Sequence, residues 1–226
     1  MSFPLRVSAV TIDLDGTLLD TIPDLAMAAN MTLAELGFAE LNPERIRTFV
    51  GKGIPRLVER TLDAALGAPP PEDLVRRALA VYERHYTAVN GKHTTVYGGV
   101  QEGLDALRED GFPLACVTNK SERFTRPLLD MVGMSSYFRH IVCGDTLPQK
   151  KPHPAPLLHA CNALGVAPAA MLMIGDSVND TQAARAAGCP VFCVTYGYNE
   201  GHDVRSLDSD ALLSSLAEAP GLIERA

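Results

Sequence analysis

The alternation of apolar runs with polar breaks beyond Thr94 predicts an α/β fold. Short apolar runs that suit buried strands alternate there with segments of helical spacing. The expected strands are Leu114–Val117, Ile141–Cys143, Met171–Ile174 and Val191–Val194. The expected helices are Val100–Leu107, Phe124–Met131, Leu157–Leu164 and Thr181–Ala187. Because strands that alternate with helices form parallel sheets with right-handed crossovers, this region predicts a Rossmann-like parallel sheet.

An apolar run also opens the chain, from Val7 to Leu14, and Gly16 marks the turn that ends it. Three segments of helical spacing then follow, separated by glycine and proline breaks: Asp24–Leu36, Ile54–Leu66 and Asp73–Val89. We therefore predict an α/β catalytic core of residues 1–18 and 94–226, with residues 19–93 inserted after the first strand as a helical cap domain. A cap over the catalytic edge can exclude water and close over a substrate.

Two carboxylates, Asp13 and Asp15, lie at the end of the first expected strand. Core packing does not require charge there, whereas the carboxyl ends of strands are where open α/β sheets bind ligands. Two neighbouring like charges are costly to bury unless a positive group holds them. A divalent cation is the expected partner. The alternative is an acidic turn, since Asp and Gly are the leading turn residues.

Two further segments carry polar groups suited to phosphate. The strand Leu114–Val117 ends at Thr118 and Asn119, whose hydroxyl and backbone amides suit phosphate oxygens. The segment KKPHP places Lys150 and Lys151 just before a proline, outside any helix interior, where an ammonium can face a phosphate. Each of these signals alone is also consistent with an ordinary helix cap or a solvated lysine pair.

The segment MLMIGDSVND ends an apolar run in Asp176, with Asp180 four residues later at an expected helix start. Acidic residues at a helix start also suit the helix dipole, which is the alternative interpretation. A strand that ends in Asp nevertheless occurs twice in the chain, and both strands would open onto the same sheet edge. Four such signals in one order are much less expected by chance than any one of them.

The four segments together resemble the four ordered motifs of the haloacid dehalogenase-like hydrolase superfamily, over nearly the whole chain. Side segments such as TLLDTIPDL, FVGKG and TYGYNEG are similar to those of bacterial phosphoglycolate phosphatases, although they are less specific than the core motifs. The resemblance implies a Mg²⁺-dependent phosphomonoester hydrolase that acts through an aspartyl-phosphate. The expected reaction converts 2-phosphoglycolate to glycolate and phosphate.

The residue types and the resemblance agree on the catalytic roles. Asp13 would be the nucleophile that attacks phosphorus. Asp15 would protonate the leaving alcohol and then deprotonate the attacking water. Thr118, the Asn119 amide and Lys151 would contact the phosphate oxygens. Lys150 is the rival for the lysine role, and Lys151 is preferred because it directly precedes the proline.

The expected metal is Mg²⁺, which suits an oxygen-only ligand set. The ligands would be the carboxylates of Asp13 and Asp176 and the backbone carbonyl of Asp15. The metal and Lys151 together would offset the repulsion between an anionic carboxylate and an anionic phosphate. By resemblance, Asp180 would orient Lys151 or a metal-bound water instead of binding the metal itself.

The expected element for substrate recognition is the FVGKG segment. Two glycines allow the backbone to approach a ligand, and Lys52 could pair with a substrate carboxylate. Arg56 is a second candidate for substrate binding. The alternative is a flexible turn with a solvated lysine.

Composition narrows the class of partner. The net charge of −7, with no basic run, argues against nucleic acid. Five cysteines, mostly inside apolar runs, suit a reducing compartment. Polar and proline breaks divide the longest apolar stretch, and the N-terminus leaves no room for a signal-peptide core. We expect a cytoplasmic enzyme that acts on a small phosphorylated metabolite, without a membrane or nucleic-acid partner. The sequence does not determine the oligomeric state.

Several alternatives stay open. A dehalogenase or phosphonate hydrolase would not be expected to carry an acid at Asp15, which disfavours both. A phosphosugar mutase of the β-phosphoglucomutase type would share the four motifs and differ in the cap. A non-catalytic phosphate-binding module is disfavoured because all the acids and the lysine are present. A phosphatase of sugar phosphates or nucleotides is the main competitor, since the fold and core motifs do not set the leaving group.

Overall fold

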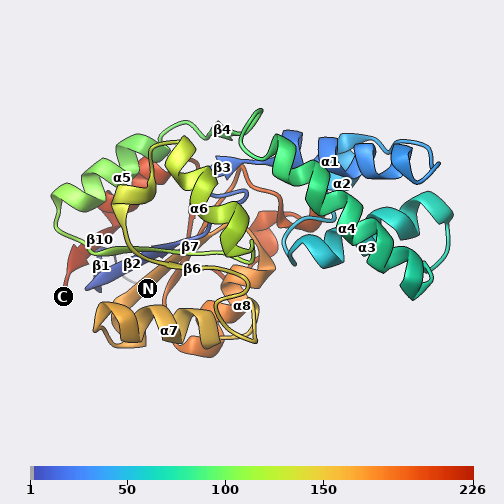
Figure 1. Cartoon of the computed structure of the whole chain (residues 1–226). Helices are drawn as coiled ribbons and strands as arrows, with labels where there is room; N and C mark the ends of the chain where they lie inside the picture. Colours follow the sequence, from blue (N-terminus) through green and yellow to red (C-terminus); the bar gives the residue numbers. More distant parts are fainter. Residues whose placement is uncertain (1–2) are drawn as a thin grey trace.

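A six-stranded sheet in the order β6-β5-β2-β7-β8-β9 forms the centre of the computed structural model, which describes residues 3–226 (Figure 1). Its strands are, in chain order, β2 (Ala9–Ile12), β5 (Leu114–Val117), β6 (Phe138–Val142), β7 (Met171–Gly175), β8 (Val191–Val194) and β9 (Ala211–Leu213). Every neighbouring pair in this sheet is parallel. The predicted α/β class with a parallel sheet is confirmed.

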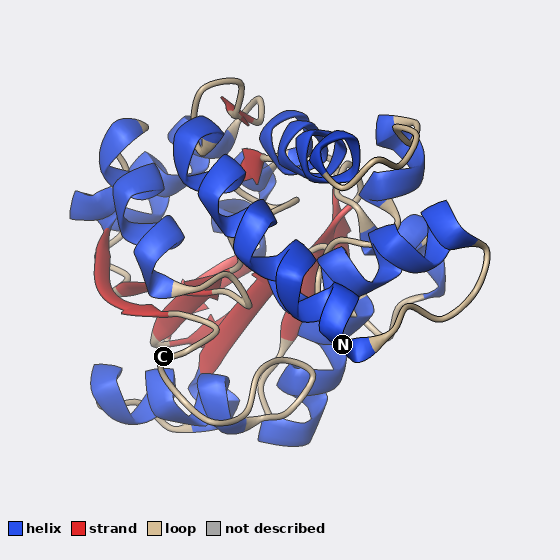
Figure 2. Ribbon diagram, turned by 45° about the vertical axis from the view of Figure 1, so that its right-hand side comes forward, coloured by secondary structure: helices blue, strands red, loops and turns tan. Residues whose placement is uncertain are grey.

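Helices cover both faces of the sheet, as Figure 2 shows. They are α5 (Val100–Glu109), α6 (Glu122–Met131), α7 (Ala155–Leu164) and α8 (Val178–Ala187). Successive side chains of β7 alternate between the two faces. Leu172 and Ile174 pack in one apolar cluster with α5 and α6, and Met171 and Met173 pack in the other with α7 and α8. Because both faces are buried, the strand is apolar at every position.

Four consecutive helices lie beyond one end of the sheet (Figure 1). They are α1 (Ile22–Glu35), α2 (Pro43–Arg47), α3 (Ile54–Leu66) and α4 (Glu72–Val89). We call residues 22–89 the helical segment. It has its own apolar cluster, in which Tyr82 and Tyr86 are fully buried, and this cluster also includes Phe124 and Tyr198 from the rest of the chain. The two connections to the sheet pair with each other as short antiparallel strands, β3 (Leu19–Asp20) and β4 (Thr95–Val96).

The first strand differs from the prediction. The expected run of residues 7–14 is divided at Ser8, whose amide donates to the Ala170 carbonyl oxygen at 2.7 Å instead of continuing one strand. The part before the division pairs in a separate two-stranded sheet, formed by β1 (Leu5–Val7) and β10 (Ile223–Arg225). The part after it, β2, ends at Ile12, so both N-terminal carboxylates lie beyond the strand.

Several short elements lie outside the predicted pattern. They include α2, β3, β4, β9 and β10, and the 3-10 turns Ser135–Tyr137, Pro168–Ala170, Asn199–Gly201, Val204–Ser206 and Leu216–Leu222. Among the residues that the structure describes, no helix is both long and apolar enough to span a membrane.

Three of the predicted site residues directly follow three adjacent strands. Asp13 follows β2, Thr118 follows β5 and Asp176 follows β7. The chain runs outward from β2 to β5 and β6 and then returns to β7 on the other side of β2. Ligands bind at such a reversal because the loops diverge and leave a crevice at the carboxyl ends of the strands.

Candidate active site

Lys151 is buried between two carboxylates at the end of the sheet. Its Nζ lies 2.8 Å from Asp13 Oδ1 and 2.7 Å from Asp180 Oδ1, and it donates to the Val117 carbonyl oxygen at 2.6 Å. Burial alone would lower the pKa of Lys151, but Asp13 and Asp180 outweigh it and raise the pKa above its usual value. The side chain is therefore held as an ammonium. Lys150, the rival in the sequence, is only partly buried.

Negative charge predominates around this ammonium. Oxygen atoms of Asp13, Asp176 and Asp180 lie within 4.8 Å of one another. Burial, together with the charges of Asp180 and Asp176, raises the pKa of Asp13 well above its usual value despite the nearby Lys151. Burial and the charge of Asp180 likewise raise the pKa of Asp176 to about 7. A group of buried carboxylates with too few cations fits a divalent metal ion.

Asp180 links the site lysine to the start of helix α8. Its Oδ1 contacts Lys151, and its Oδ2 accepts hydrogen bonds from the Ser177 hydroxyl at 2.8 Å and the Ser177 amide at 3.1 Å. Asp180 is thus placed to orient the Lys151 ammonium. The metal ligands expected from the sequence, namely the Asp13 and Asp176 carboxylates and the Asp15 carbonyl, stay a prediction.

Asp176 lies before helix α8, which corrects the expectation that it shares the helix start with Asp180. Ser177 is the N-cap residue, and Asp180 is the third helical residue of a capping box. Asp176 is held instead by the segment after β8, since its Oδ2 accepts the Tyr198 amide at 2.6 Å. A side chain at Gly197 would collide with Asp176, so this close approach requires glycine.

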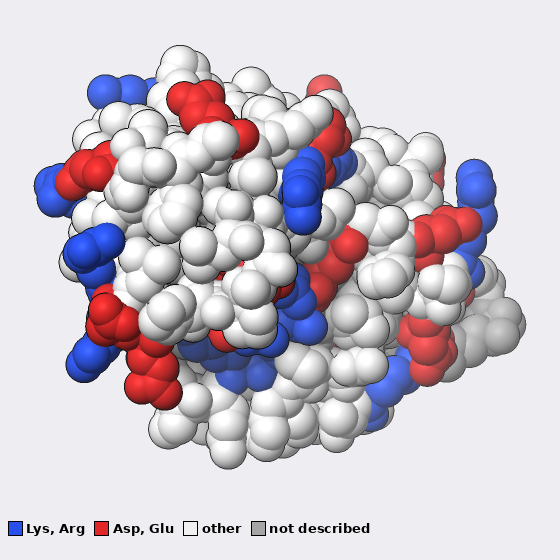
Figure 3. Space-filling view, turned by 90° about the vertical axis from the view of Figure 1, so that its right-hand side faces the viewer, with Lys and Arg blue, Asp and Glu red and all other residues white. Residues whose placement is uncertain are grey.

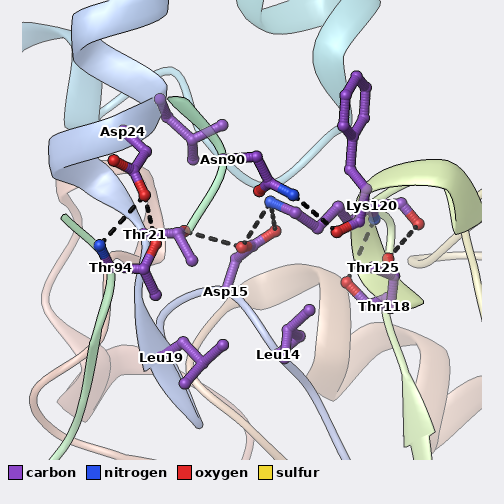
Figure 4. A network of polar contacts seen from close by, with 12 residues as sticks. Leu14, Asp15, Leu19, Thr21, Asp24, Asn90, Thr94, Thr118, Lys120 and Thr125 are labelled. Carbon is purple, nitrogen blue, oxygen red and sulfur yellow. Dashed lines mark hydrogen bonds and ion pairs between the residues drawn. The ribbon is translucent and has the colours of Figure 1, made fainter. Parts of the chain in front are cut away.

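Asp15 is held by a network that joins the sheet edge to the helical segment (Figure 4). The Thr21 hydroxyl donates to Asp15 Oδ1 at 2.7 Å, and Lys120 Nζ lies 3.0 Å from the same oxygen. Lys120 Nζ also donates to the Tyr86 hydroxyl at 2.6 Å. Lys120 was not among the predicted site residues, although it lies in the VTNKS segment that supplies Thr118.

Thr118 and Asn119 line the cavity beside Asp13. The Asn119 side chain is fully used within the protein. Its Nδ2 donates to the carbonyl oxygens of Gly51 and Lys151, each at 2.8 Å, and its Oδ1 accepts the Lys151 amide at 3.0 Å. Asn119 therefore ties the FVGKG loop to the site lysine, and its backbone amide is the group left for a ligand.

The cavity has one polar and one largely apolar wall and a volume of about 40 Å³. The sheet edge supplies the polar wall: Asp13, Asp15, Thr118, Asn119 and Lys120. The helical segment supplies the other: Leu25, Val50, Gly51, Gly53, Ile54 and Leu57. A reacting phosphoryl group can be held by the polar wall while the apolar wall excludes water.

Lys52 and Arg56 are placed differently from the sequence expectation. Lys52 Nζ lies 3.2 Å from Glu200 Oε1, and Arg56 pairs with Glu59 on the exposed side of α3. Neither side chain lines the cavity described above. The glycines of the FVGKG loop do line it, whereas the lysine between them points to the segment after β8.

The surface on the side of the helical segment shows acidic and basic side chains interspersed (Figure 3). This view shows no broad basic face among the described residues.

The chain belongs to the haloacid dehalogenase-like hydrolase family, whose sequence model matches residues 10–194. It is 58% identical over 225 residues to a phosphoglycolate phosphatase of Nitrosospira multiformis, covering 100% of this chain and 99% of that protein. It is 54% identical over 225 residues to a phosphoglycolate phosphatase of Thiobacillus denitrificans, with the same coverage.

Solved structures show the same similarity. A crystal structure of a predicted phosphoglycolate phosphatase from Haemophilus somnus 129PT has a TM-score of 0.89 and 32% identity, covering 94% of this chain and 96% of that one. A crystal structure of CbbY from Rhodobacter sphaeroides in complex with xylulose-(1,5)bisphosphate has a TM-score of 0.79 and 25% identity, covering 96% and 100%. These similarities define the chain as a phosphomonoester hydrolase of this family.

Proposed function

We propose that the chain hydrolyses 2-phosphoglycolate to glycolate and phosphate, with Asp13 as the nucleophile and Mg²⁺ as the cofactor. The observation that carries this proposal is the position of Asp13, which directly follows the central strand β2 and lies 2.8 Å from the buried Lys151 ammonium. The relatives that share more than half of its residues over the full chain are phosphoglycolate phosphatases, which supports this substrate.

The side chains divide the reaction into two steps. An Asp13 oxygen forms a bond to phosphorus while the bond from phosphorus to the substrate's alcohol oxygen breaks, and Asp15 gives that oxygen a proton. Asp15 then takes a proton from a water that attacks the aspartyl-phosphate, which releases phosphate. Lys151 and the Thr118 hydroxyl stabilise the charge on the phosphoryl oxygens. When bound by Asp13, Asp15 and Asp176, Mg²⁺ would neutralise part of that charge.

We propose residues 19–93 as a cap over a core of residues 1–18 and 94–226. The separate apolar cluster of the helical segment and the two-stranded connection β3–β4 support this division. The five cysteines are free and buried, which supports a reducing, cytoplasmic location.

A steady-state screen of phosphorylated metabolites with Mg²⁺ tests the substrate. The panel includes 2-phosphoglycolate, sugar phosphates, nucleotides and a hexose 1-phosphate whose products are identified. We expect kcat/KM to be highest for 2-phosphoglycolate. A higher value for a sugar phosphate or nucleotide would replace the substrate while keeping the reaction class, and an isomerised hexose phosphate would indicate a mutase.

A further inference from the structure

We propose that Lys120 binds the carboxylate of the substrate and thereby selects 2-phosphoglycolate. This inference rests on the proposed function. Among the described residues that line the cavity, Lys120 is the one with a cationic side chain. The site lysine, Lys151, is occupied by Asp13 and Asp180 and serves the phosphoryl group. A substrate with a second anionic group therefore needs a second cation, and Lys120 is in the correct place.

The contacts of Lys120 leave it one donor for a ligand. Its side chain is 2% exposed, and its ammonium has three N–H groups. One is directed to the Asp15 carboxylate, whose Oδ1 and Oδ2 lie 3.0 Å and 3.4 Å from Nζ, and one to the Tyr86 hydroxyl at 2.6 Å. Nζ lies 4.9 Å from the centroid of the Tyr86 ring, toward its hydroxyl end. The ammonium is thus fixed by Asp15 and the Tyr86 hydroxyl, so little side-chain entropy is lost when the third N–H meets a carboxylate.

The position next to Asp15 matches the covalent structure of the substrate. Asp15 protonates the oxygen that leaves phosphorus, and in 2-phosphoglycolate the carboxylate carbon is two bonds from that oxygen. A carboxylate at Lys120 and a leaving oxygen at Asp15 can therefore be held together by groups only 3.0 Å apart. The opposite wall of the cavity, with Leu25, Ile54 and Leu57, offers a carboxylate no charged partner.

The alternative cation in the FVGKG loop is engaged elsewhere. Lys52 Nζ lies 3.2 Å from Glu200 Oε1, and Lys52 does not line the cavity. For Lys52 to bind the substrate, its ammonium would have to leave this ion pair and turn toward the sheet edge. Lys120 needs no such rearrangement.

The test compares two substrates that differ only in the carboxylate: 2-phosphoglycolate and 2-hydroxyethyl phosphate. For each enzyme, the preference is the ratio of kcat/KM on the first to kcat/KM on the second. A loss of folded enzyme lowers both values equally and cancels in this ratio. Lys120→Met keeps the length of the side chain and removes its charge. Lys52→Met tests the rival, and Arg126→Met is a matched control on the exposed side of α6.

We expect Lys120→Met to lower the preference by about 10- to 150-fold, the range for a charge-assisted hydrogen bond, while Lys52→Met and Arg126→Met leave it unchanged. An unchanged preference in Lys120→Met, with equal losses on both substrates, would show that Lys120 only positions Asp15 and would overturn the inference. A loss of preference in Lys52→Met alone would also overturn it. A wild-type enzyme with no preference for 2-phosphoglycolate would instead overturn the proposed substrate, and the role of Lys120 with it.

Discussion

The guanidinium of Arg60 lies 2.8 Å from Glu200 Oε2, so a carboxylate after β8 holds helix α3 of the helical segment. Lys52 contacts the other oxygen of the same carboxylate. Burial acts against the charge of Glu200, yet Arg60 and Lys52 outweigh it and lower the pKa of this carboxyl. The amide of Tyr198, two residues earlier, donates to Asp176. One short segment thus contacts both the predicted metal site and the loop over the cavity.

We predict that Glu200→Gln loosens the FVGKG loop and raises KM for 2-phosphoglycolate. Because Arg60 and Lys52, the two partners of Glu200, are partly exposed, losing this ion pair should weaken substrate binding by about 1 kcal/mol, which is roughly a fivefold increase in KM. Hydrogen exchange of the backbone amides in residues 49–53 should also become faster. Glu59→Gln removes an exposed ion pair on the same helix and is the matched control, for which we expect neither change. Unchanged exchange and KM in Glu200→Gln would show that this ion pair does not hold the loop.

Asp15→Asn is predicted to separate proton transfer from metal binding. The amide cannot give or take the proton, so both formation and hydrolysis of the aspartyl-phosphate should slow by about 10²-fold or more. Mg²⁺ affinity should change little, because the expected ligand at this position is the backbone carbonyl. Asp176→Asn, which removes a carboxylate ligand, is the comparison in a Mg²⁺ titration. Equal weakening of Mg²⁺ binding by the two variants would contradict the assigned roles.

The metal-free enzyme is predicted to lose stability as pH rises. Burial and Asp180 raise the pKa of Asp176 to about 7 in the folded chain, whereas an unfolded Asp has a pKa of about 3.9. Between these values the folded state binds more protons than the unfolded state, so the free energy of unfolding falls with increasing pH. Bound Mg²⁺ should remove this fall because it stabilises the ionised carboxylate.

Urea unfolding in EDTA at about pH 5 and about pH 8 measures this effect. The decrease in the free energy of unfolding between these pH values should be smaller in Asp176→Asn than in the wild type by about 1 kcal/mol or more. Repeating both measurements with excess Mg²⁺ provides the control. If the free energy of unfolding of Asp176→Asn in EDTA decreases with pH as steeply as that of the wild type, the carboxyl of Asp176 is not the cause of the decrease.

The features that the sequence predicted are those set by local pattern. Apolar runs such as Met171–Ile174 are buried on both faces of the sheet, so a continuous apolar sequence indicates a buried strand. Asp13 and Thr118 end such runs, and strand adjacency then brings them together. Among the elements that were missed, α2 and β9 have five and three residues, too few to show a period. The division at Ser8 depends on a contact with Ala170, which no local pattern reveals.

The charged residues around the cavity were harder to assign for the same reason. Lys120 pairs with Asp15, which is 105 positions away, and it was one lysine among several in loops. Lys52 was predicted to bind substrate because glycines flank it in the sequence. In the structure, its ammonium instead forms an ion pair with Glu200. A lysine's place in a motif indicates its backbone position, whereas its partner is decided by which distant carboxylate the fold brings near.

The central claim is that Asp13 becomes phosphorylated, and rapid acid quenching measures this directly. The enzyme with Mg²⁺ is mixed with ³²P-labelled 2-phosphoglycolate, quenched in acid within one turnover and digested, and the labelled peptide is sequenced. We predict acid-stable label on Asp13 in the wild type and no label in Asp13→Asn. In Asp15→Asn, the ratio of labelled enzyme to the turnover rate should be higher than in the wild type. Turnover without label on the protein, label on another residue, or an Asp13→Asn variant that keeps a tenth of the wild-type kcat would contradict the account.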